Sequence, residues 1–154
     1  MDITVHDITI SDLSKVAELF DSYRQFYEQA PDFDRAYQFI TERFNKGESV
    51  ILLAEDNEKR AVGFCQLYPT FCSVEAAPIY TLYDLYVVPG ARKQGVGKAL
   101  LLAAESKAIA EGKLRMDLTT AKTNLSAQSL YESLGWQRDN IFYAYNRYPK
   151  NSLI

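Results

Sequence analysis

The chain has 154 residues, of which 47% are hydrophobic and 13% aromatic, so it contains enough apolar material for one sizeable core. Seventeen basic against twenty acidic side chains give a formal charge of −3, which argues against nucleic acid as a partner, because nucleic-acid binders present a positive field to phosphates. No run approaches the ~20 unbroken apolar residues that a membrane span needs. We therefore expect a single domain, residues 1–154, with no nucleic-acid or membrane partner.

The N-terminal sequence and the cysteines bear on the location of the protein. The first residues, MDITVHD, carry an acid at position 2 and no apolar run of signal-peptide length, which favours a cytoplasmic protein. Cys65 and Cys72 are the only cysteines, and in a reducing compartment we expect both to be free thiols. The sole histidine, His6, and two cysteines cannot supply a closed zinc site, so no metal is expected.

The first third of the chain predicts a strand followed by two helices. Met1–Ile10 alternates apolar and polar residues in the manner of a strand. Apolar residues at helical spacing follow until Pro31 interrupts them. Asp32 suits the N-cap of a second amphipathic helix, which Gly47 ends.

Three strands are predicted in the middle of the chain. Ser49–Ala54 and Ala61–Tyr68 are rich in apolar and β-branched residues and flank a polar turn at residues 55–60, which indicates a hairpin. Ile79–Val88 is a longer strand pattern, and Pro89-Gly90 stops it because proline cannot continue a ladder.

The last third alternates helices and strands. Gly95–Glu111 and the segment from Asn124 to Gly135 have helical spacing, whereas Leu114–Thr119 and Trp136–Arg147 have strand character. The complete order is βααβββαβαβ. It predicts an α/β or α+β domain in which helices cover a mixed sheet.

The loop between the longer strand and the next helix has the composition of an anion-binding site. The first amide groups of a helix lack intrahelical partners and carry the positive end of the helix dipole, so they can hold a phosphate. Gly95 and Gly97 would let a bulky phosphate approach those amides. The residues that would contact the anion are Arg92, Lys93, Gln94, Gly95, Val96, Gly97 and Lys98.

Two other glycine loops fit this segment poorly. A nucleoside triphosphate loop needs Lys-Ser/Thr after its second glycine, but Val96 follows Gly95. A dinucleotide fingerprint needs a third glycine where Leu100 stands. On its own, the loop could also be a glycine-rich turn with a solvated cationic face, or a generic phosphate site for a nucleotide.

Two motifs together resemble the GCN5-related N-acetyltransferases, the GNAT family. Arg92-x-x-Gly95-x-Gly97 is similar to the pyrophosphate loop of that family, Gln/Arg-x-x-Gly-x-Gly/Ala. The helix that begins at Asn124 and closes with Gly135-Trp136 is similar to the family's second signature, which includes a tyrosine at the place of Tyr131. The element order matches from the first strand to about Arg147. The resemblance implies the acyl-CoA N-acyltransferase fold, with a splayed central strand.

The resemblance also implies acetyl-coenzyme A as cosubstrate. In the family, the loop amides hold its pyrophosphate and the pantetheine arm lies along the central strand, here Leu85, Tyr86 and Val87. By analogy with the family, the Leu85 N–H would stabilise the oxyanion of a tetrahedral intermediate, which forms when a free amine attacks the thioester. Tyr131 would be the acid that protonates the departing thiolate, and Asn124 would cap its helix, touch the cofactor arm, or do both. Alternatively, Tyr131 is only an aromatic residue of the core, and the strand that contains Leu85, Tyr86 and Val87 is an ordinary core strand.

The general base is less clear from the sequence. Relatives such as polyamine acetyltransferases carry Leu-Glu-Asp on the central strand, where this chain has Leu82-Tyr83-Asp84. The departure at Tyr83 leaves Asp84 or a water relay as the base, and a structural ion pair is the other interpretation of Asp84. His6 is expected at the surface or in an edge strand.

The sequence is less specific about the acceptor and the oligomeric state. Tyr27, Tyr83 and Asp84 would bind the acceptor, since aromatic faces and a carboxylate attract an ammonium, although tyrosines also build ordinary cores. A small-molecule amine and a peptide lysine both remain open, and we expect a homodimer. The alternative function is a non-catalytic acyl-CoA-binding sensor or complex subunit.

Overall fold

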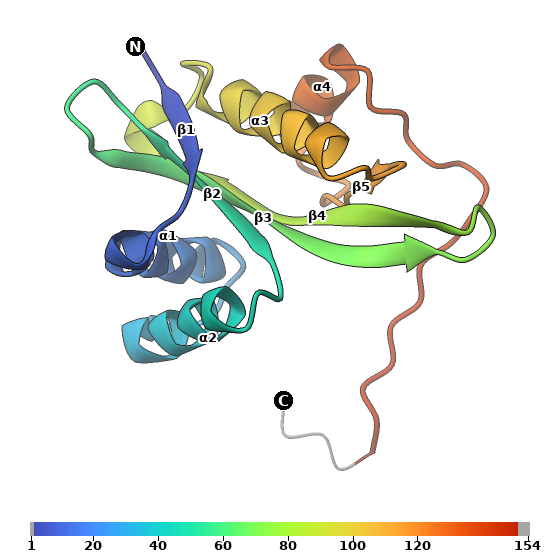
Figure 1. Ribbon diagram of the computed structural model, residues 1–154, viewed down its shortest axis with the longest axis horizontal. Helices are drawn as coiled ribbons and strands as arrows, with labels where there is room; N and C mark the ends of the chain where they lie inside the picture. Colours follow the sequence, from blue (N-terminus) through green and yellow to red (C-terminus); the bar gives the residue numbers. More distant parts are fainter. Residues whose placement is uncertain (1, 151–154) are drawn as a thin grey trace. The chain divides into compact units, whose positions relative to one another are not determined.

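Five strands form one mixed sheet in the computed structural model, which describes residues 2–150 (Figure 1). The strands lie side by side in sequence order; neighbours among the first four are antiparallel, and β5 is parallel to β4. Their bounds are β1 Thr4–Asp7, β2 Val50–Glu55, β3 Ala61–Cys72, β4 Ala77–Val87 and β5 Met116–Asp117.

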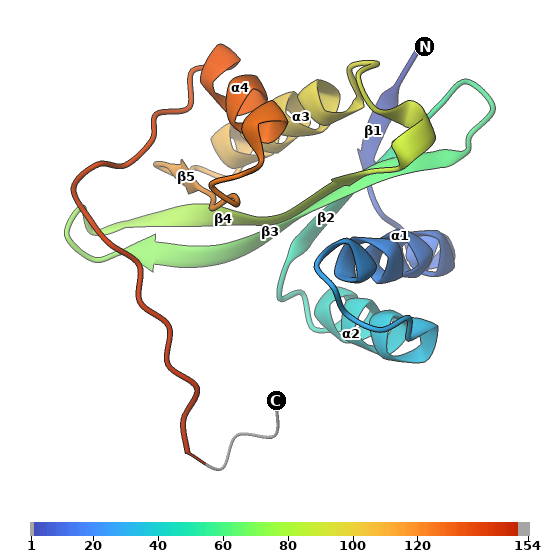
Figure 2. The same ribbon diagram turned by 180° about the vertical axis from the view of Figure 1, so that it is seen from behind.

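Helices cover both faces of this sheet. α1 (Leu13–Phe26) and α2 (Phe33–Asn45) lie on one face and α3 (Val96–Ala110) lies on the other (Figures 1 and 2). One hydrophobic core cluster joins α1 and α2 to the sheet and is built from these buried residues: Ile8, Leu13, Val16, Leu19, Phe20, Ala36, Ile40, Ile51, Leu53, Phe64 and Tyr86. The layered mixed α/β architecture confirms the predicted fold class.

A glycine lets α3 approach the sheet. A Cβ atom added at Gly63 would lie 2.8 Å from the Tyr86 carbonyl oxygen and 3.1 and 3.2 Å from side-chain atoms of Val96 and Leu100. Since real Cβ atoms do not tolerate the first distance, only glycine permits this packing. Gly63 pairs with Val87 at the end of β4, so the close packing sets the first turn of α3 beside the end of that strand.

Strand β3 is longer than the sequence predicts. β3 continues past Tyr68 to Cys72, and Pro69 lies within it opposite Tyr80. The ladder between β2 and β3 ends at Leu67, so β3 has a free side from there on. Proline is tolerated at that point because its missing N–H has no partner strand to serve.

The residues fall into two compact units with the boundary between Thr119 and Thr120. The second unit contains α4 (Leu125–Ser133), which Asn124 caps by accepting a hydrogen bond from the Ala127 N–H at 3.1 Å. The prediction of a strand at Trp136–Arg147 is wrong, because the structure assigns no strand to residues 136–147. The predicted strand at Leu114–Thr119 is reduced to the two residues of β5.

Two smaller expectations concern the cysteines and the membrane. Cys65 is buried and Cys72 is half-buried, and both are free thiols. Among residues 2–150, the helices are too short or too polar to cross a bilayer.

Candidate functional site

The first turn of α3 is free of side-chain caps. Gly95 occupies the N-cap with a φ of 87°, and no side chain accepts a hydrogen bond there. The N–H of Ala99 donates to the Gly95 carbonyl at 3.0 Å, so the amides of residues 96–98 precede the first intrahelical bond. Lys93 also has a positive φ, 62°, which bends the loop sharply before the helix. The predicted anion cradle therefore has the required backbone geometry.

The cations of the loop do not all play the same part. Lys93 and Lys98 are exposed at the surface. Arg92 instead folds back onto β4: its Nε donates to the Val87 carbonyl at 2.9 Å, and its guanidinium carbon lies 5.7 Å from the ring centres of both Phe26 and Tyr86. Arg92 thus connects the loop to the end of β4 and to the last turn of α1.

The outer edge of β4 is open next to this loop. β4 pairs with β5 only at Tyr80 and Thr81. In the described part of the chain, no strand continues that pairing alongside residues 82–87, although β3 pairs with β4 on the other side. The backbone of Leu85, Tyr86 and Val87 consequently has one paired side and one side without a neighbouring strand, as a splayed central strand requires.

A bulge in β4 lies within this open edge, at Tyr83. Gln66 pairs with Asp84 and Leu67 with Leu82, so Tyr83 has no partner in β3. The ring of Tyr83 lies 5.6 Å from the ring of Tyr68, edge to face. A bulge interrupts the regular alternation of side chains along a strand, and here it does so between Leu82 and Asp84.

Asp84 is a buried carboxylate held by neutral groups. Its side chain is on the face covered by α1 and α2, the residue is 4% exposed, and Gln66 Nε2 donates to its Oδ2 at 2.6 Å. The orientation of the Gln66 amide is fixed because Ser49 Oγ donates to its Oε1 at 2.7 Å. Burial raises the pKa of Asp84, and the hydrogen bond from Gln66 offsets part of that effect. Among residues 2–150, no cationic side chain lies within ion-pair distance of Asp84.

Tyr23, in α1, brings the predicted acceptor residues together. Its hydroxyl donates to the Tyr83 carbonyl at 3.3 Å, and its ring lies 5.1 Å from the ring of Tyr27. Tyr27 and Tyr83 are 48% and 67% exposed, whereas Asp84 is buried. The three residues predicted to bind the acceptor therefore form one cluster, with aromatic rings at the surface and a carboxylate beneath.

Sequence reasoning missed Gln66, whose side chain donates a hydrogen bond to Asp84. Gln66 is a polar residue inside a run of apolar ones in Ala61–Tyr68, a signal that was available. The bond of Tyr23 to the Tyr83 carbonyl depends on the packing of α1 against β4, which the sequence does not show.

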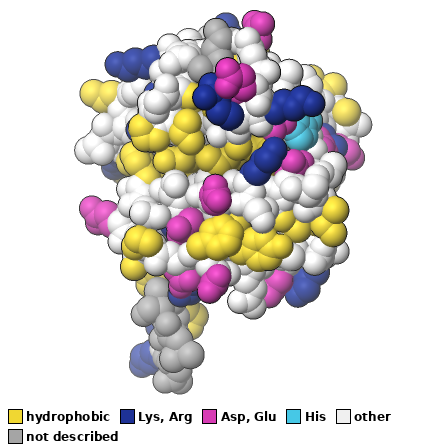
Figure 3. Space-filling model, turned by 90° about the vertical axis from the view of Figure 1, so that its left-hand side faces the viewer, with side chains coloured by type: hydrophobic (Ala, Val, Ile, Leu, Met, Phe, Trp, Pro, Cys, Tyr) yellow, Lys and Arg dark blue, Asp and Glu magenta, His cyan; other side chains and the backbone are white. Residues whose placement is uncertain are grey.

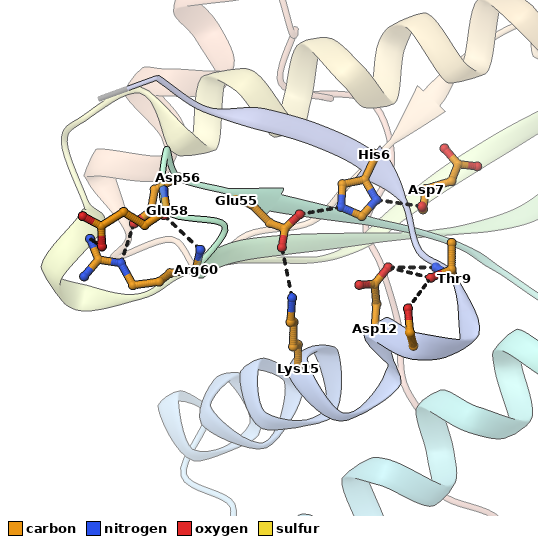
Figure 4. Close-up of polar contacts among 10 residues, drawn as sticks. His6, Asp7, Thr9, Asp12, Lys15, Glu55, Asp56, Glu58 and Arg60 are labelled. Atoms are coloured by element: carbon orange, nitrogen blue, oxygen red, sulfur yellow. Dashed lines mark hydrogen bonds and ion pairs between the residues drawn. The ribbon is translucent and has the colours of Figure 1, made fainter.

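A second buried carboxylate, Glu55, lies at the end of β2 (Figure 4). His6 Nε2 lies 2.8 Å from its Oε1 and Lys15 Nζ lies 3.2 Å from its Oε2. His6 Nδ1 donates to the Asp7 carbonyl at 2.9 Å. His6 lies in the edge strand β1 and its side chain is partly exposed, which confirms its predicted place. The face of the molecule in Figure 3 carries hydrophobic, acidic and basic side chains. This cluster joins β1, β2 and α1 and is separate from the Asp84 network.

The second unit contains the predicted acid. Tyr131 lies in α4, and its ring centre is 6.1 Å from that of Trp136. Gly135, with a φ of 91°, ends the helix, and the N–H of Trp136 donates to the Tyr131 carbonyl at 3.0 Å. The signature around Asn124 and Tyr131 thus forms a capped helix with a glycine-dependent turn.

Comparisons with known proteins agree with this geometry. The model of the acetyltransferase (GNAT) family matches residues 13–136. A Bacillus subtilis (strain 168) protein named as an uncharacterized N-acetyltransferase, YhfO, is 44% identical over 143 residues, which are 93% of this chain and 95% of the relative. A crystal structure of a probable acetyltransferase is 36% identical and superposes with a TM-score of 0.88, covering 99% of this chain and 100% of that one.

A more distant structure has the same fold. It is AAC(6')-Iy in complex with a bisubstrate analogue, CoA-S-monomethyl-acetylneamine, with a TM-score of 0.79, 18% identity and coverage of 96% of this chain and 99% of that one. The family match over most of the chain and the nearly full-length relative establish the family. The chain belongs to the acetyltransferase (GNAT) family and is an acyltransferase enzyme.

Proposed function

We propose that the protein is a single-domain N-acetyltransferase that moves acetyl from acetyl-coenzyme A to a primary amine by direct attack through a tetrahedral intermediate. One observation carries this proposal: the uncapped first turn of α3 lies at the end of β4, whose outer edge is open from residue 82 to residue 87. The first feature suits a diphosphate and the second an extended chain with amide groups. Acetyl-coenzyme A combines both chemistries in one molecule.

The start of α3 fits a pyrophosphate. The amides of Val96, Gly97 and Lys98 can donate to its oxygens, and the helix dipole favours its charge. Lys93 and Lys98 add positive charge at the rim, and Gln94 braces the loop by donating from Nε2 to the Gly90 carbonyl at 3.2 Å. Arg92 fixes the end of β4 relative to this loop through its bond to Val87.

The open edge of β4 fits the pantetheine arm. An extended chain with amide groups can pair with a free strand edge, and here the edge comprises Leu85, Tyr86 and Val87. At the far end of that arm, the Leu85 N–H would donate to the oxyanion that forms on the thioester carbonyl. Such a donor acts without reorganisation, because the strand holds it in place before the reaction.

Proton transfers complete the proposed reaction. The amine must lose a proton before it attacks, and Asp84 is the proposed acceptor of that proton because burial raises its pKa toward the useful range. Tyr131 is the proposed donor to the departing thiolate, with Asn124 ordering the helix that carries it. A Tyr131→Phe variant tests this role: turnover should fall while the Kd for acetyl-coenzyme A changes only a few-fold.

The acceptor is proposed as a cationic primary amine of a small molecule or a peptide lysine. Exposed rings of Tyr27 and Tyr83 attract an ammonium through their faces, and the Asp84 carboxylate beneath adds negative charge. The AAC(6')-Iy complex holds an analogue that joins coenzyme A to a small-molecule acceptor, which supports the small-molecule alternative. A cytoplasmic location and a homodimer stay predictions.

The decisive experiment follows release of free coenzyme A thiol from acetyl-coenzyme A with a panel of polyamines, aminoglycosides, amino acids and lysine peptides. We expect thiol release that depends on one class of amine. Binding of acetyl-coenzyme A in calorimetry without amine-dependent release would support the non-catalytic sensor instead. A thermal-shift comparison with ATP and NAD tests the generic nucleotide alternative, since a specific ligand raises the melting temperature.

Substitution at Gly97 tests the cosubstrate site directly. Gly97→Asp should abolish binding of coenzyme A, because it places bulk and negative charge at the amides that would hold the pyrophosphate. Gly97→Ala is the matched control, since it adds one methyl group without charge, and it should retain most of the affinity. An unchanged Kd for Gly97→Asp in calorimetry would remove the loop from the site.

A further inference from the structure

The side chain of Arg92 leaves the loop before α3 and reaches the face of the sheet that carries α1. Its guanidinium carbon lies 5.7 Å from the ring centres of Phe26, the last residue of α1, and Tyr86. Tyr86 belongs to the core cluster under α1 and α2, whereas α3 packs on the opposite face (Figures 1 and 2). The guanidinium therefore lies on the same face as the buried side chain of Asp84.

The backbone contact of Arg92 lies on the open edge of β4. The N–H of Val88 donates to the Val62 carbonyl at 2.9 Å, so these two residues form a hydrogen-bonded pair. Bonded and non-bonded pairs alternate along an antiparallel ladder, so the next pair, Val87 with Gly63, is non-bonded and the Val87 carbonyl points away from β3. Arg92 Nε donates to that carbonyl at 2.9 Å, and this bond anchors the planar guanidinium.

Arg92 completes a closed circle of side-chain contacts. Its four aromatic members are joined by ring-centre distances of 5.2 Å for Phe26–Tyr27, 5.1 Å for Tyr27–Tyr23 and 6.3 Å for Tyr23–Tyr86. Arg92 joins the two ends of this series, Phe26 and Tyr86. Because each contact restricts the next side chain, the position of Tyr27 depends on Arg92 through Phe26.

The two outer aromatic rings of the circle gain most from such a restraint. Phe26 and Tyr27 are 54% and 48% exposed, and they are the last residue and the C-cap of α1. Glu28 follows with a φ of 66°, so the chain leaves the helical path there. Half-exposed rings at a helix end receive little restraint from core packing, and contact with an anchored cation restricts their rotamers.

We propose that Arg92 is a positioning residue of the acceptor site, because it holds Phe26 and thereby fixes the exposed ring of Tyr27 on which the amine rests. The guanidinium acts through its planar shape, its anchor on Val87 and its charge beside two rings. This role differs from the contact with the pyrophosphate that the sequence predicts for Arg92. The inference rests on the proposed acetylation of an amine.

A measurement without ligands tests whether Arg92 acts on Tyr27. NMR of protein labelled with carbon-13 in the tyrosine rings follows the Tyr27 signal, with Tyr27→Phe for assignment. Arg92→Gln should shift this signal, because it opens the circle of contacts at Phe26. Phe33→Leu is the matched control and should leave the signal unchanged, since Phe33 is a 40% exposed aromatic residue of α2 whose ring lies beside that of Tyr37.

Two substitutions of Arg92 separate its shape from its charge. Arg92→Gln places a neutral N–H donor at the position of Nε, because that nitrogen is bonded to Cδ in both side chains. Arg92→Lys keeps the positive charge but has a methylene group there, so the cation loses its anchor on Val87. A pyrophosphate contact made by charge would be kept by Arg92→Lys and lost by Arg92→Gln. In the positioning role, both variants keep the Kd for coenzyme A within a few-fold in calorimetry.

Kinetics tests the effect on the acceptor, with saturating acetyl-coenzyme A and the amine of the panel above that has the highest kcat/KM. Arg92→Gln and Arg92→Lys should each raise the KM for the amine by about fivefold, the size expected for one exposed cation–π contact, with kcat within about twofold. Phe26→Leu should raise KM similarly, and its combination with Arg92→Gln should add little, since both open the same circle. Phe33→Leu should leave KM unchanged.

The outcomes separate the positioning role from the proposed function. A wild type that transfers acetyl to no amine overturns the proposed function, and the positioning role falls with it. With an active wild type, the role alone is overturned by an unchanged Tyr27 signal or amine KM in Arg92→Gln. It is also overturned by a Kd for coenzyme A that rises in Arg92→Gln and not in Arg92→Lys. A raised amine KM that is not additive with Phe26→Leu, together with a retained Kd, supports it.

Discussion

Two buried carboxylates lie on different strands of the same sheet and have opposite surroundings. Glu55, at the end of β2, faces the cations His6 and Lys15, whose hydrogen bonds and charges outweigh the cost of burial and lower its pKa. Asp84, in β4, accepts a hydrogen bond from the neutral Gln66 amide, and burial raises its pKa. The surroundings of Glu55 favour its ionised form, and those of Asp84 favour its protonated form.

The difference separates a structural role from a chemical one. A carboxylate with two cationic partners has little reason to change its protonation state, so its contribution is to join β1, β2 and α1. A buried carboxylate without a cation costs folding free energy whenever it is ionised. A protein keeps such a group where a reaction uses it, which favours Asp84 over Glu55 as the base.

The largest expected effect is on activity. Asp84→Asn should lower kcat by about 100-fold or more, because an amide cannot accept the proton of the amine. Glu55→Gln should leave kcat within a few-fold of the wild type, since Glu55 belongs to the separate cluster around His6. Both variants are measured with the same amine and saturating acetyl-coenzyme A. Equal losses in the two variants would break the comparison.

A smaller effect is expected on stability, and here the substitution of Glu55 should have the larger effect of the two. Glu55→Gln removes the charge that pairs with Lys15 and His6, and the free energy of unfolding should fall by about 1 kcal/mol or less because those partners are partly exposed. Asp84→Asn should lose no stability at neutral pH, since it removes an unpaired buried charge. Urea unfolding of both variants at pH 7 measures the difference, and a less stable Asp84→Asn would contradict the assignment of Asp84 as an energetic cost.

The smallest effect concerns the pH dependence of stability. The hydrogen bond to the Asp7 carbonyl, followed by the contact with Glu55, raises the pKa of His6 despite partial burial. A raised pKa in the folded state means that the stabilisation is complete below the unfolded value of about 6.5 and is lost as the pH rises through the folded value. Between about pH 6 and pH 8, the melting temperature of the wild type should therefore fall more than that of His6→Gln. Parallel curves would show that His6 does not contribute in this way.

Features set by local chemistry could be predicted from the sequence. Asp32 caps α2 by accepting from the Arg35 N–H at 3.1 Å, and Gly47 follows that helix with a φ of 61°. Both depend on a few consecutive residues. The glycine loop before α3 is of the same kind, because the uncapped helix start follows from Gly95 and its neighbours.

Features set by pairing could not be predicted in the same way. The bulge at Tyr83 and the contact of Gln66 with Asp84 depend on the register between β3 and β4, which no short segment encodes. Residues 136–147 have the alternation of a strand, but a strand forms only where another strand pairs with it. β3 extends through Pro69 for the complementary reason, since it has a partner on one side and none on the other.

The short β5 has a consequence for handling the protein. A sheet edge that a ligand completes is also an edge on which a neighbouring molecule can add a strand, and exposed backbone edges are starting points for aggregation. Residues 82–87 of β4 are such an edge while no ligand covers them. Because we propose that coenzyme A binds along this edge, we expect purification in its presence to reduce aggregation in concentrated solution.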